Sequence, residues 1–307
     1  MHCKYIKEEK SISTTVKQLS ETLMGLIYKD SMDVAQKLSL VREVPYLENT
    51  FEFSLKDYFN GTKNEFGFDT LYVSYIIYNC DTMNEYYEKV YTYGKNSESS
   101  YDDRTMLIVT GMVEGQILPS FSEEVFHEVT HLYQYGNGME KRVNLYDNVI
   151  KMMKSCDNKI CDAILRITYM SFKHEQDAFA HQFYAKLKTN RDNRGFDETL
   201  IGTEYDFYKK LRITYFYDKE TDRKYVEDFL SKLGMDCNLF EKRMNYGASR
   251  LKSKFKNAYD KYKIDTYRSN LKLEQSNKLM ITKMEILNEY RKRYNSLEFD
   301  DELIYKF

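Results

Sequence analysis

The spacing of hydrophobic residues changes along this chain, from strand-like patterns in the first third to helical periodicity further on. Residues 51–56 alternate apolar and polar side chains, while residues 71–78 and 105–110 are short apolar runs rich in β-branched residues. Alternation predicts a strand with one buried face, and a continuous apolar run predicts a strand buried on both faces. The sequence therefore predicts a small sheet in the N-terminal third together with helices, one of them within residues 13–40.

Helical signals follow Pro119. Residues 120–123 read Ser-Phe-Ser-Glu, the pattern of a capping box, and Gly136 stands where a C′ glycine would end the helix. A second helical pattern runs from about residue 160 to residue 187, and the polar stretch 188–195 predicts a loop after it.

The remainder of the chain lacks proline and carries two apolar stripes at helical spacing. The first stripe is Met244, Ala248, Leu251, Phe255, Ala258 and Tyr262, and the second is Met280, Met284, Leu287 and Tyr294. We therefore predict a boundary near residue 200, with one domain over residues 1–200 and a helical C-terminal region over residues 201–307.

The C-terminal region is also basic. Residues 241–294 hold 15 Lys and Arg against six Asp and Glu, whereas the whole chain has a net charge of −2. This charge asymmetry would allow the basic region to contact the acidic remainder of the chain, an anionic partner or nucleic acid. No nucleic-acid motif is present, so nucleic acid is not expected, and a protein partner for the C-terminal helices stays open.

The segment with the clearest chemistry is His127-Glu128-Val129-Thr130-His131, in the middle of the helix predicted after Pro119. Residues four apart lie one turn apart on the same face of a helix, so both imidazoles can bind one metal ion. Glu128 points to a neighbouring angle, where it can accept a proton without being a ligand. This spacing is that of a catalytic zinc site. The alternative is an ordinary amphipathic helix with hydrogen-bonded histidines.

A catalytic zinc site takes three protein ligands and leaves one position open. Four of the five histidines, all except His2, lie in two short segments, and the second segment spans residues 174–181. Glu175 is the predicted third ligand, because it projects from a buried face of the later helix; otherwise it is one more solvated charge. His174 and His181 stay open as alternative ligands or oxyanion stabilisers.

HExxH on one helix and Glu-x-x-Ala on a later helix resemble the gluzincin group of zinc metallopeptidases. The resemblance covers roughly residues 106–180. It implies a zincin-like α+β fold, a peptide or protein substrate, and one Zn²⁺ per chain. It also implies that His127, His131 and Glu175 are the zinc ligands and that Glu128 is the general base and proton shuttle.

The chain departs from related patterns at several positions. Gln134 and Asn137 stand where the metzincin pattern requires glycine and histidine, which excludes that group. The 43 residues of the segment 132–174 are more than thermolysin-like enzymes have between these ligands. Phe179 replaces the acidic residue that those enzymes carry four positions after the ligand, so the partner that orients the first histidine is unassigned; Asp177, offset from Glu175 by two helix positions, is a candidate.

The resemblance further implies that the strand at residues 105–110 is an edge strand that pairs with the substrate backbone. A plain structural strand is the alternative. The chain has no 18-residue apolar run and no N-terminal segment suited to a signal peptide, so we expect a soluble, cytoplasmic protein without a membrane segment. Its five cysteines are odd in number and widely spaced, which predicts reduced thiols. The rival to a zinc peptidase is a catalytically inactive, zincin-shaped protein that binds through its basic C-terminal helices.

Overall fold

The computed structural model describes residues 13–38, 46–93, 95–113, 116–137 and 144–296. The chain forms two compact units, Met1–Lys261 and Tyr262–Phe307. The first unit contains a small mixed sheet and a helical part, which agrees with the predicted α+β class in its general form.

The sheet has the strand order β1-β2-β4-β3, and β5 also pairs with β4. β1 and β2 are antiparallel, β2 and β4 are parallel, and both β3 and β5 run antiparallel to β4. The strands are β1 (Tyr46–Ser54), β2 (Thr70–Cys80), β3 (Glu98–Ser100), β4 (Thr105–Val113) and β5 (Gln116–Ile117). The three predicted strands are confirmed, but β1 ends earlier than predicted because Ser54 accepts a hydrogen bond from the N–H of Asp57 and caps helix α2 (Leu55–Phe59).

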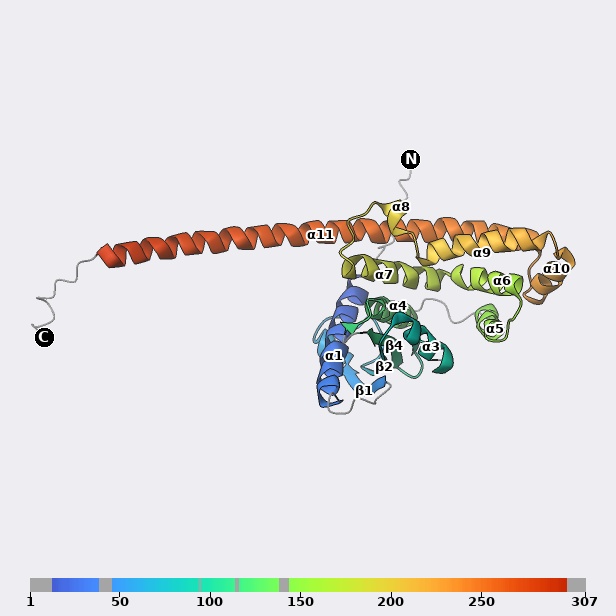
Figure 1. The fold of residues 1–307 in the computed structure, drawn as a ribbon, viewed down its shortest axis with the longest axis horizontal. Helices are drawn as coiled ribbons and strands as arrows, with labels where there is room; N and C mark the ends of the chain where they lie inside the picture. Colours follow the sequence, from blue (N-terminus) through green and yellow to red (C-terminus); the bar gives the residue numbers. More distant parts are fainter. Residues whose placement is uncertain (1–12, 39–45, 94, 114–115, 138–143, 297–307) are drawn as a thin grey trace, which may run out of the picture. The chain divides into compact units, whose positions relative to one another are not determined.

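Helices cover both faces of the sheet (Figure 1). α1 (Thr14–Leu38) and α4 (Ser120–Gly136) pack on one face, where alternate residues of β2 meet apolar side chains of both helices. α3 (Met83–Tyr93) lies against the other face. The main core on the α1 and α4 side includes Leu19, Leu23, Leu71, Val73, Tyr75, Ile77, Val125 and Val129.

Both ends of α4 differ from the sequence prediction in detail. The predicted capping box is wrong: the helix begins at Ser120 without a side-chain cap, and the hydroxyl of Ser122 donates back to the carbonyl of Pro119 at 3.0 Å. Gly136 is the last helical residue. A Cβ atom at this position would lie 2.4 Å from the carbonyl oxygen of Phe66, so glycine is required by close backbone approach and not by a left-handed cap.

The helical pattern predicted over residues 160–187 forms two helices instead of one. α6 (Lys159–Met170) ends before α7 (Lys173–Thr189) begins, because Phe172 has an extended backbone and Ser171 donates its hydroxyl proton to the carbonyl of Thr168 at 2.7 Å. The helices after the sheet are α5 (Asn144–Met153), α6 (Lys159–Met170), α7 (Lys173–Thr189), α8 (Phe196–Thr199), α9 (Glu204–Lys219), α10 (Arg223–Lys232) and α11 (Cys237–Ser296).

The first compact unit continues beyond residue 200. α9 and α10 pack against α6, and the rings of Phe183 in α7 and Phe255 in α11 stack with centroids 4.5 Å apart. The residues of the first apolar stripe that belong to this unit are buried, as their helical spacing predicts: Met244, Ala248, Leu251, Phe255 and Ala258. The division at residue 200 stays a prediction about domains, whereas the compact unit ends at Lys261.

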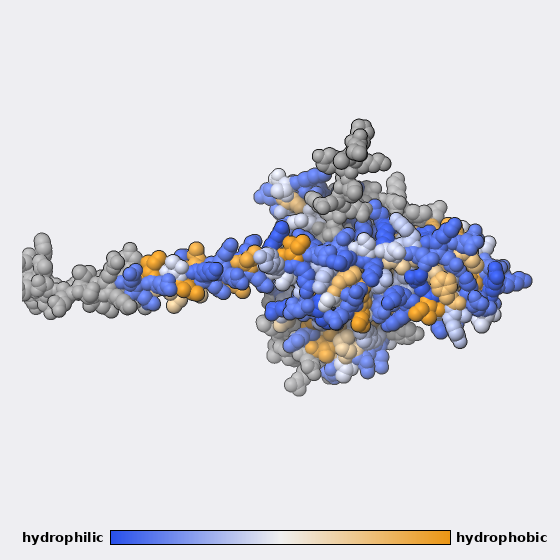
Figure 2. Space-filling model, turned by 90° about the horizontal axis from the view of Figure 1, so that it is seen from above, coloured by the Kyte–Doolittle hydropathy of each residue, from blue (hydrophilic) through white to orange (hydrophobic). Residues whose placement is uncertain are grey.

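The C-terminal part of α11 belongs to the second unit, and the structure describes this helix up to Ser296. Met280, Met284 and Leu287 of the second stripe are 60%, 57% and 59% exposed, and the side chain of Tyr294 lies outside the described part. Figure 2 shows apolar side chains along this helix. Among the described residues, no helix combines the length and apolar character needed to cross a membrane.

The outer edge of β4 is occupied along its length, so the prediction that it is a free edge for substrate is wrong. β3 covers residues 105–107 and β5 covers residues 112–113. Between them, the Oγ of Ser97 lies 3.0 Å from the amide nitrogen of Val109, and the carbonyl of Gly111 accepts from the N–H of Leu118 at 2.9 Å. The segments before and after β4 therefore both pair with its outer edge.

The described cysteines, Cys80, Cys156, Cys161 and Cys237, are free thiols, as predicted. Cys3 lies outside the described residues.

Candidate metal centre

The structure brings the three predicted ligands together between α4 and α7. His127 and His131 lie on one face of α4, and Glu175 lies in the first turn of α7. Their candidate ligand atoms all lie within 4.8 Å of one another. The side chains of His127 and His131 are 11% and 12% exposed, and that of Glu175 is fully buried. Glu175 is therefore not a solvated surface charge.

The distances between the facing atoms fit a tetrahedral ion. The Nε2 atoms of His127 and His131 lie 3.1 Å apart, and Oε2 of Glu175 lies 3.7 Å and 3.6 Å from them, respectively. Zinc bonds of about 2.0–2.1 Å at tetrahedral angles separate neighbouring ligand atoms by about 3.3–3.4 Å. Small shifts of the side chains suffice for all three atoms to bind one ion.

The two oxygens of Glu175 have different surroundings. Oε1 accepts a hydrogen bond from the hydroxyl of Tyr146 at 2.7 Å, whereas Oε2 has no hydrogen-bond partner among the described residues and faces the two imidazoles. A buried carboxylate oxygen without a donor is costly unless a cation or proton compensates it. The donor set of two imidazoles and one carboxylate is one of the recurring sets of catalytic zinc sites. The residues therefore fit a zinc ion.

Each imidazole also has a partner on its other nitrogen. Nδ1 of His127 lies 3.1 Å from the amide oxygen of Gln182 in α7, and Nδ1 of His131 lies 3.3 Å from the amide oxygen of Gln134. Partners of this kind orient a metal-binding imidazole. The prediction that Asp177 orients the first histidine is wrong, because the carboxylate of Asp177 pairs with Lys254 at 2.7 Å.

Glu128 is held beside the triad. It is 6% exposed, and its Oε2 accepts a hydrogen bond from the hydroxyl of Ser99 in β3 at 2.8 Å. Burial raises the pKa of the Glu128 carboxyl, although His131 and the Ser99 hydrogen bond oppose the shift. A raised pKa brings a carboxylate closer to the range in which it works as a general base.

In the metal-free protein, burial and the neighbouring charged groups together shift the pKa values of the three predicted ligands. Burial lowers the pKa of His127 to about 4, and the nearby His131 adds to this effect. Burial also opposes charge on His131, but the Glu175 carboxylate outweighs it and raises the pKa of His131 to about 9. Burial would raise the pKa of Glu175, but the imidazoles, His131 first, hold it well below its usual range. The triad thus favours a cation at this point.

The two other histidines of the second segment have separate positions. His181 is not a ligand: its Nδ1 lies 2.8 Å from the carbonyl of Asp177, and its Nε2 accepts from the N–H of Ser13 before α1. His174 lies beside the triad, with its Nε2 3.5 Å from Oε1 of Glu175. Its role as an oxyanion stabiliser stays a prediction.

Several residues of this site were missed by sequence reasoning. Gln134 follows His131 by three positions, so its place on the same face of the helix could have been noticed. Ser99, Tyr146 and Gln182 reach the site from β3, α5 and α7, and no local spacing relates them to the HExxH segment.

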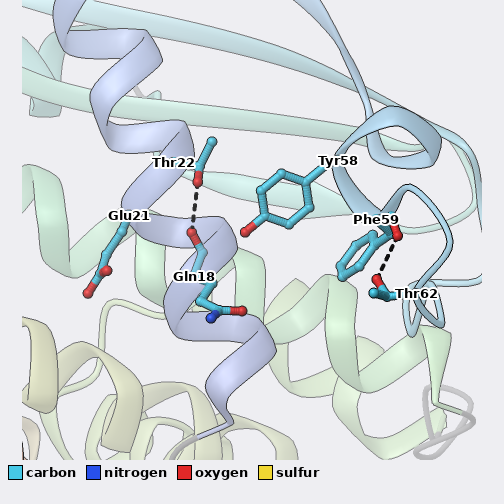
Figure 3. Close-up of a pocket in the computed structure, with 6 residues that line it drawn as sticks. All are labelled: Gln18, Glu21, Thr22, Tyr58, Phe59 and Thr62. Atoms are coloured by element: carbon cyan, nitrogen blue, oxygen red, sulfur yellow. Dashed lines mark hydrogen bonds between the residues drawn. The ribbon is translucent and has the colours of Figure 1, made fainter.

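A separate cavity of 570 Å³ lies between α1 and the turn after α2 (Figure 3). Thr22 and Thr62 donate their hydroxyl protons to the carbonyls of Gln18 and Phe59, respectively. Glu21 pairs with Lys188. The lining side chains do not form a convergent set of ligands, so this cavity does not compete with the triad as a metal centre.

No protein-family model matches this chain, and no curated protein or solved structure matches it either. The function is therefore inferred from the chemistry of the site.

Proposed function

We propose that this protein is a zinc-dependent metallopeptidase in which His127, His131 and Glu175 hold one Zn²⁺ and Glu128 is the general base. The observation that carries the proposal is the fully buried Oε2 of Glu175, which lies 3.6–3.7 Å from both facing imidazole nitrogens and has no hydrogen-bond partner among the described residues. A cation at this point would compensate the buried charge, and three protein ligands leave one position open for chemistry.

The chain's own residues divide the work of peptide hydrolysis. A bound zinc ion would supply Lewis acidity, lowering the pKa of a water molecule to about 7 and polarising a carbonyl. Glu128 takes the proton of the attacking water and returns it to the leaving amine. Ser99 holds the Glu128 carboxylate through a 2.8 Å hydrogen bond, which limits its freedom to turn away.

The arrangement of elements supports a zincin-like fold for this site. α4 carries the two histidines and lies on a small mixed sheet, and the later helix α7 supplies the carboxylate. β3 stands at the end of the strand order, and its Ser99 contacts Glu128. We therefore place the substrate backbone along β3, where main-chain hydrogen bonds can extend the sheet.

Zinc analysis together with Glu128→Gln tests the proposal. The purified protein should contain, or take up, one zinc per chain. Glu128→Gln should keep the metal and lose peptide hydrolysis, since its carboxylate is needed for proton transfer and not for coordination. Absence of zinc after reconstitution would refute the proposal that this protein is a zinc metallopeptidase. Loss of zinc in Glu128→Gln would show that this residue is a ligand.

The rival function, binding through the C-terminal helix, is supported by the exposed second unit. Leu273, Met280 and Leu287 recur every seven residues and are 61%, 60% and 59% exposed. Asn270 and Asn277 are also seven residues apart, and each lies three positions before an apolar residue of this repeat. In a parallel pair of helices, identical Asn side chains can donate to and accept from each other, which favours a second copy of this chain as the partner.

Sedimentation of the full chain tests this self-association. We expect a dimer or a larger oligomer at micromolar concentration, and a monomer when Met280→Asp and Leu287→Asp are combined. The control combines Ile201→Asp and Ile213→Asp, because these residues are 70% and 68% exposed but lie outside α11. A monomeric wild-type protein would contradict the expectation.

A further inference from the structure

Gln182 connects the first histidine of the triad to a carboxylate on α9. Its amide oxygen lies 3.1 Å from Nδ1 of His127, and its amide nitrogen donates to Oε1 of Glu204 at 3.0 Å. The two ends of an amide have nearly the same shape, so its orientation is decided by the groups that it faces. An ionised carboxylate only accepts hydrogen bonds. Glu204 therefore turns the NH₂ group of Gln182 toward itself and the oxygen toward His127.

This orientation determines which nitrogen of His127 carries the proton. An amide oxygen can only accept, so Nδ1 of His127 must be the protonated nitrogen. Nε2 is then the unprotonated nitrogen, and it lies 3.1 Å from Nε2 of His131 and 3.7 Å from Oε2 of Glu175. A metal ligand needs this tautomer, because only an unprotonated nitrogen can bind an ion.

Other charged groups surround the same amide. Glu123 in the first turn of α4 lies near Gln182, and Lys186 of α7 acts electrostatically on both Glu123 and Glu204. A carboxylate near this amide favours the same orientation of Gln182 that Glu204 requires, because an ionised carboxylate only accepts hydrogen bonds.

The second histidine has a different anchor. Gln134 accepts from His131 within α4 and donates its amide proton to the main-chain carbonyl of His174 at 3.0 Å. A main-chain carbonyl never donates, and no side-chain substitution removes it. The orientation of His131 is therefore independent of α9, whereas that of His127 depends on a side chain 77 positions later in the chain.

We propose that Glu204 is a positioning residue for the metal centre: through Gln182 it holds His127 in the tautomer whose Nε2 can bind zinc. The inference rests on the proposed zinc site and makes α9 part of that site. Glu204 does not touch the metal position or the substrate. Its effect is on the proton distribution of His127, which a purely structural role would leave unchanged.

Nitrogen NMR of the metal-free, full-length protein at pH 8 measures the tautomer of His127 directly. We expect the Nδ1–H form in the wild type and a mixture with the Nε2–H form in Glu204→Gln, because a second amide can donate as well as accept. Zinc affinity, measured by competition with a chelator, should fall about tenfold or more in this variant. Glu220→Gln, an exposed substitution at the C-cap of α9, should change neither quantity.

Exchanging the two residues provides a rescue. In the double variant Gln182→Glu with Glu204→Gln, a carboxylate accepts directly from Nδ1 of His127, so the Nδ1–H form and the zinc affinity should return toward the wild-type values. The double variant also separates a specific effect from a general loss of folding.

An unchanged tautomer and zinc affinity in Glu204→Gln would overturn the positioning role while leaving the zinc site intact. If the wild-type protein binds no zinc, the proposed function fails. The tautomer comparison in metal-free protein still decides whether Glu204 controls His127. An affinity loss without a tautomer change would also overturn the proposal, since it would indicate packing.

Discussion

The hydroxyl of Tyr146 donates a hydrogen bond to Oε1 of Glu175 at 2.7 Å, so the other carboxylate oxygen faces the two imidazoles. Tyr169 lies near Glu175 as well, and burial followed by the charge of Glu175 raises the pKa of Tyr169. Tyr146 comes from α5 and Tyr169 from α6. A helix earlier in the chain, α5, thus orients a ligand that α7 supplies, and α6 lies beside it.

Tyr146→Phe is expected to lower zinc affinity about tenfold, because loss of a hydrogen bond to a ligand typically costs 10–100-fold in affinity. Chelator competition measures this effect. Tyr217→Phe is the control, since Tyr217 is 78% exposed. Equal zinc affinity in Tyr146→Phe and the wild type would show that the hydrogen bond from Tyr146 does not contribute to zinc binding.

Glu175→Ala is expected to abolish stoichiometric zinc binding at micromolar zinc, because it removes both a ligand and the negative charge that offsets the ion in a buried site. Glu274→Ala is the control, since Glu274 is an exposed residue of α11. Inductively coupled plasma analysis of dialysed protein gives the zinc content. Retention of one zinc per chain in Glu175→Ala would show that the third ligand is another residue.

The contribution of Glu124 and Glu204 to the stability of the metal-free protein should decrease as the pH rises from about 4.5 to about 7. Burial, followed by the charge of Glu128, raises the pKa of Glu124 from 4.5 to about 7, and burial raises that of Glu204 to about 7. Between these pH values the two carboxyls bind more protons in the folded protein than in the unfolded chain, so their contribution to the free energy of unfolding falls with rising pH.

Glu124→Gln removes one of these contributions and should flatten the decrease, by at most about 1.4 kcal/mol per pH unit. Urea unfolding at several pH values measures the free energy of unfolding, and the exposed substitution Glu274→Gln provides the comparison. A profile for Glu124→Gln that parallels the wild type would show that Glu124 titrates at the same pH in folded and unfolded protein.

Gly136→Ala should lower the free energy of unfolding by about 1–3 kcal/mol, since the added Cβ meets backbone that cannot move without shifting the end of α4. The nearest atom is the carbonyl oxygen of Phe66 at 2.4 Å. Gly25→Ala in α1 should have the opposite sign and stabilise by up to about 1 kcal/mol, because nothing lies within 4 Å of its Cβ position. Thermal and urea unfolding of both variants check the contrast.

Local patterns determined a large part of this protein. The apolar runs at residues 71–78 and 105–110 form β2 and β4, and the four-residue spacing of His127 and His131 places both on one face of α4. These features follow from the periods of the strand and the helix, which depend on neighbouring residues only. The break near Ser171 escaped this reasoning, because a pattern of helical period on both sides conceals a turn between two helices.

Only the tertiary structure decided which side chains complete the site. Sequence spacing left Glu175, His174 and His181 as candidate ligands, and the packing of α7 on α4 turns Glu175 alone toward both imidazoles while His181 receives a hydrogen bond from Ser13. Gln182 and Glu204 could not be identified from the sequence, because their contacts join residues from three helices. Such contacts depend on how helices pack, and helix packing is determined by many side chains at once.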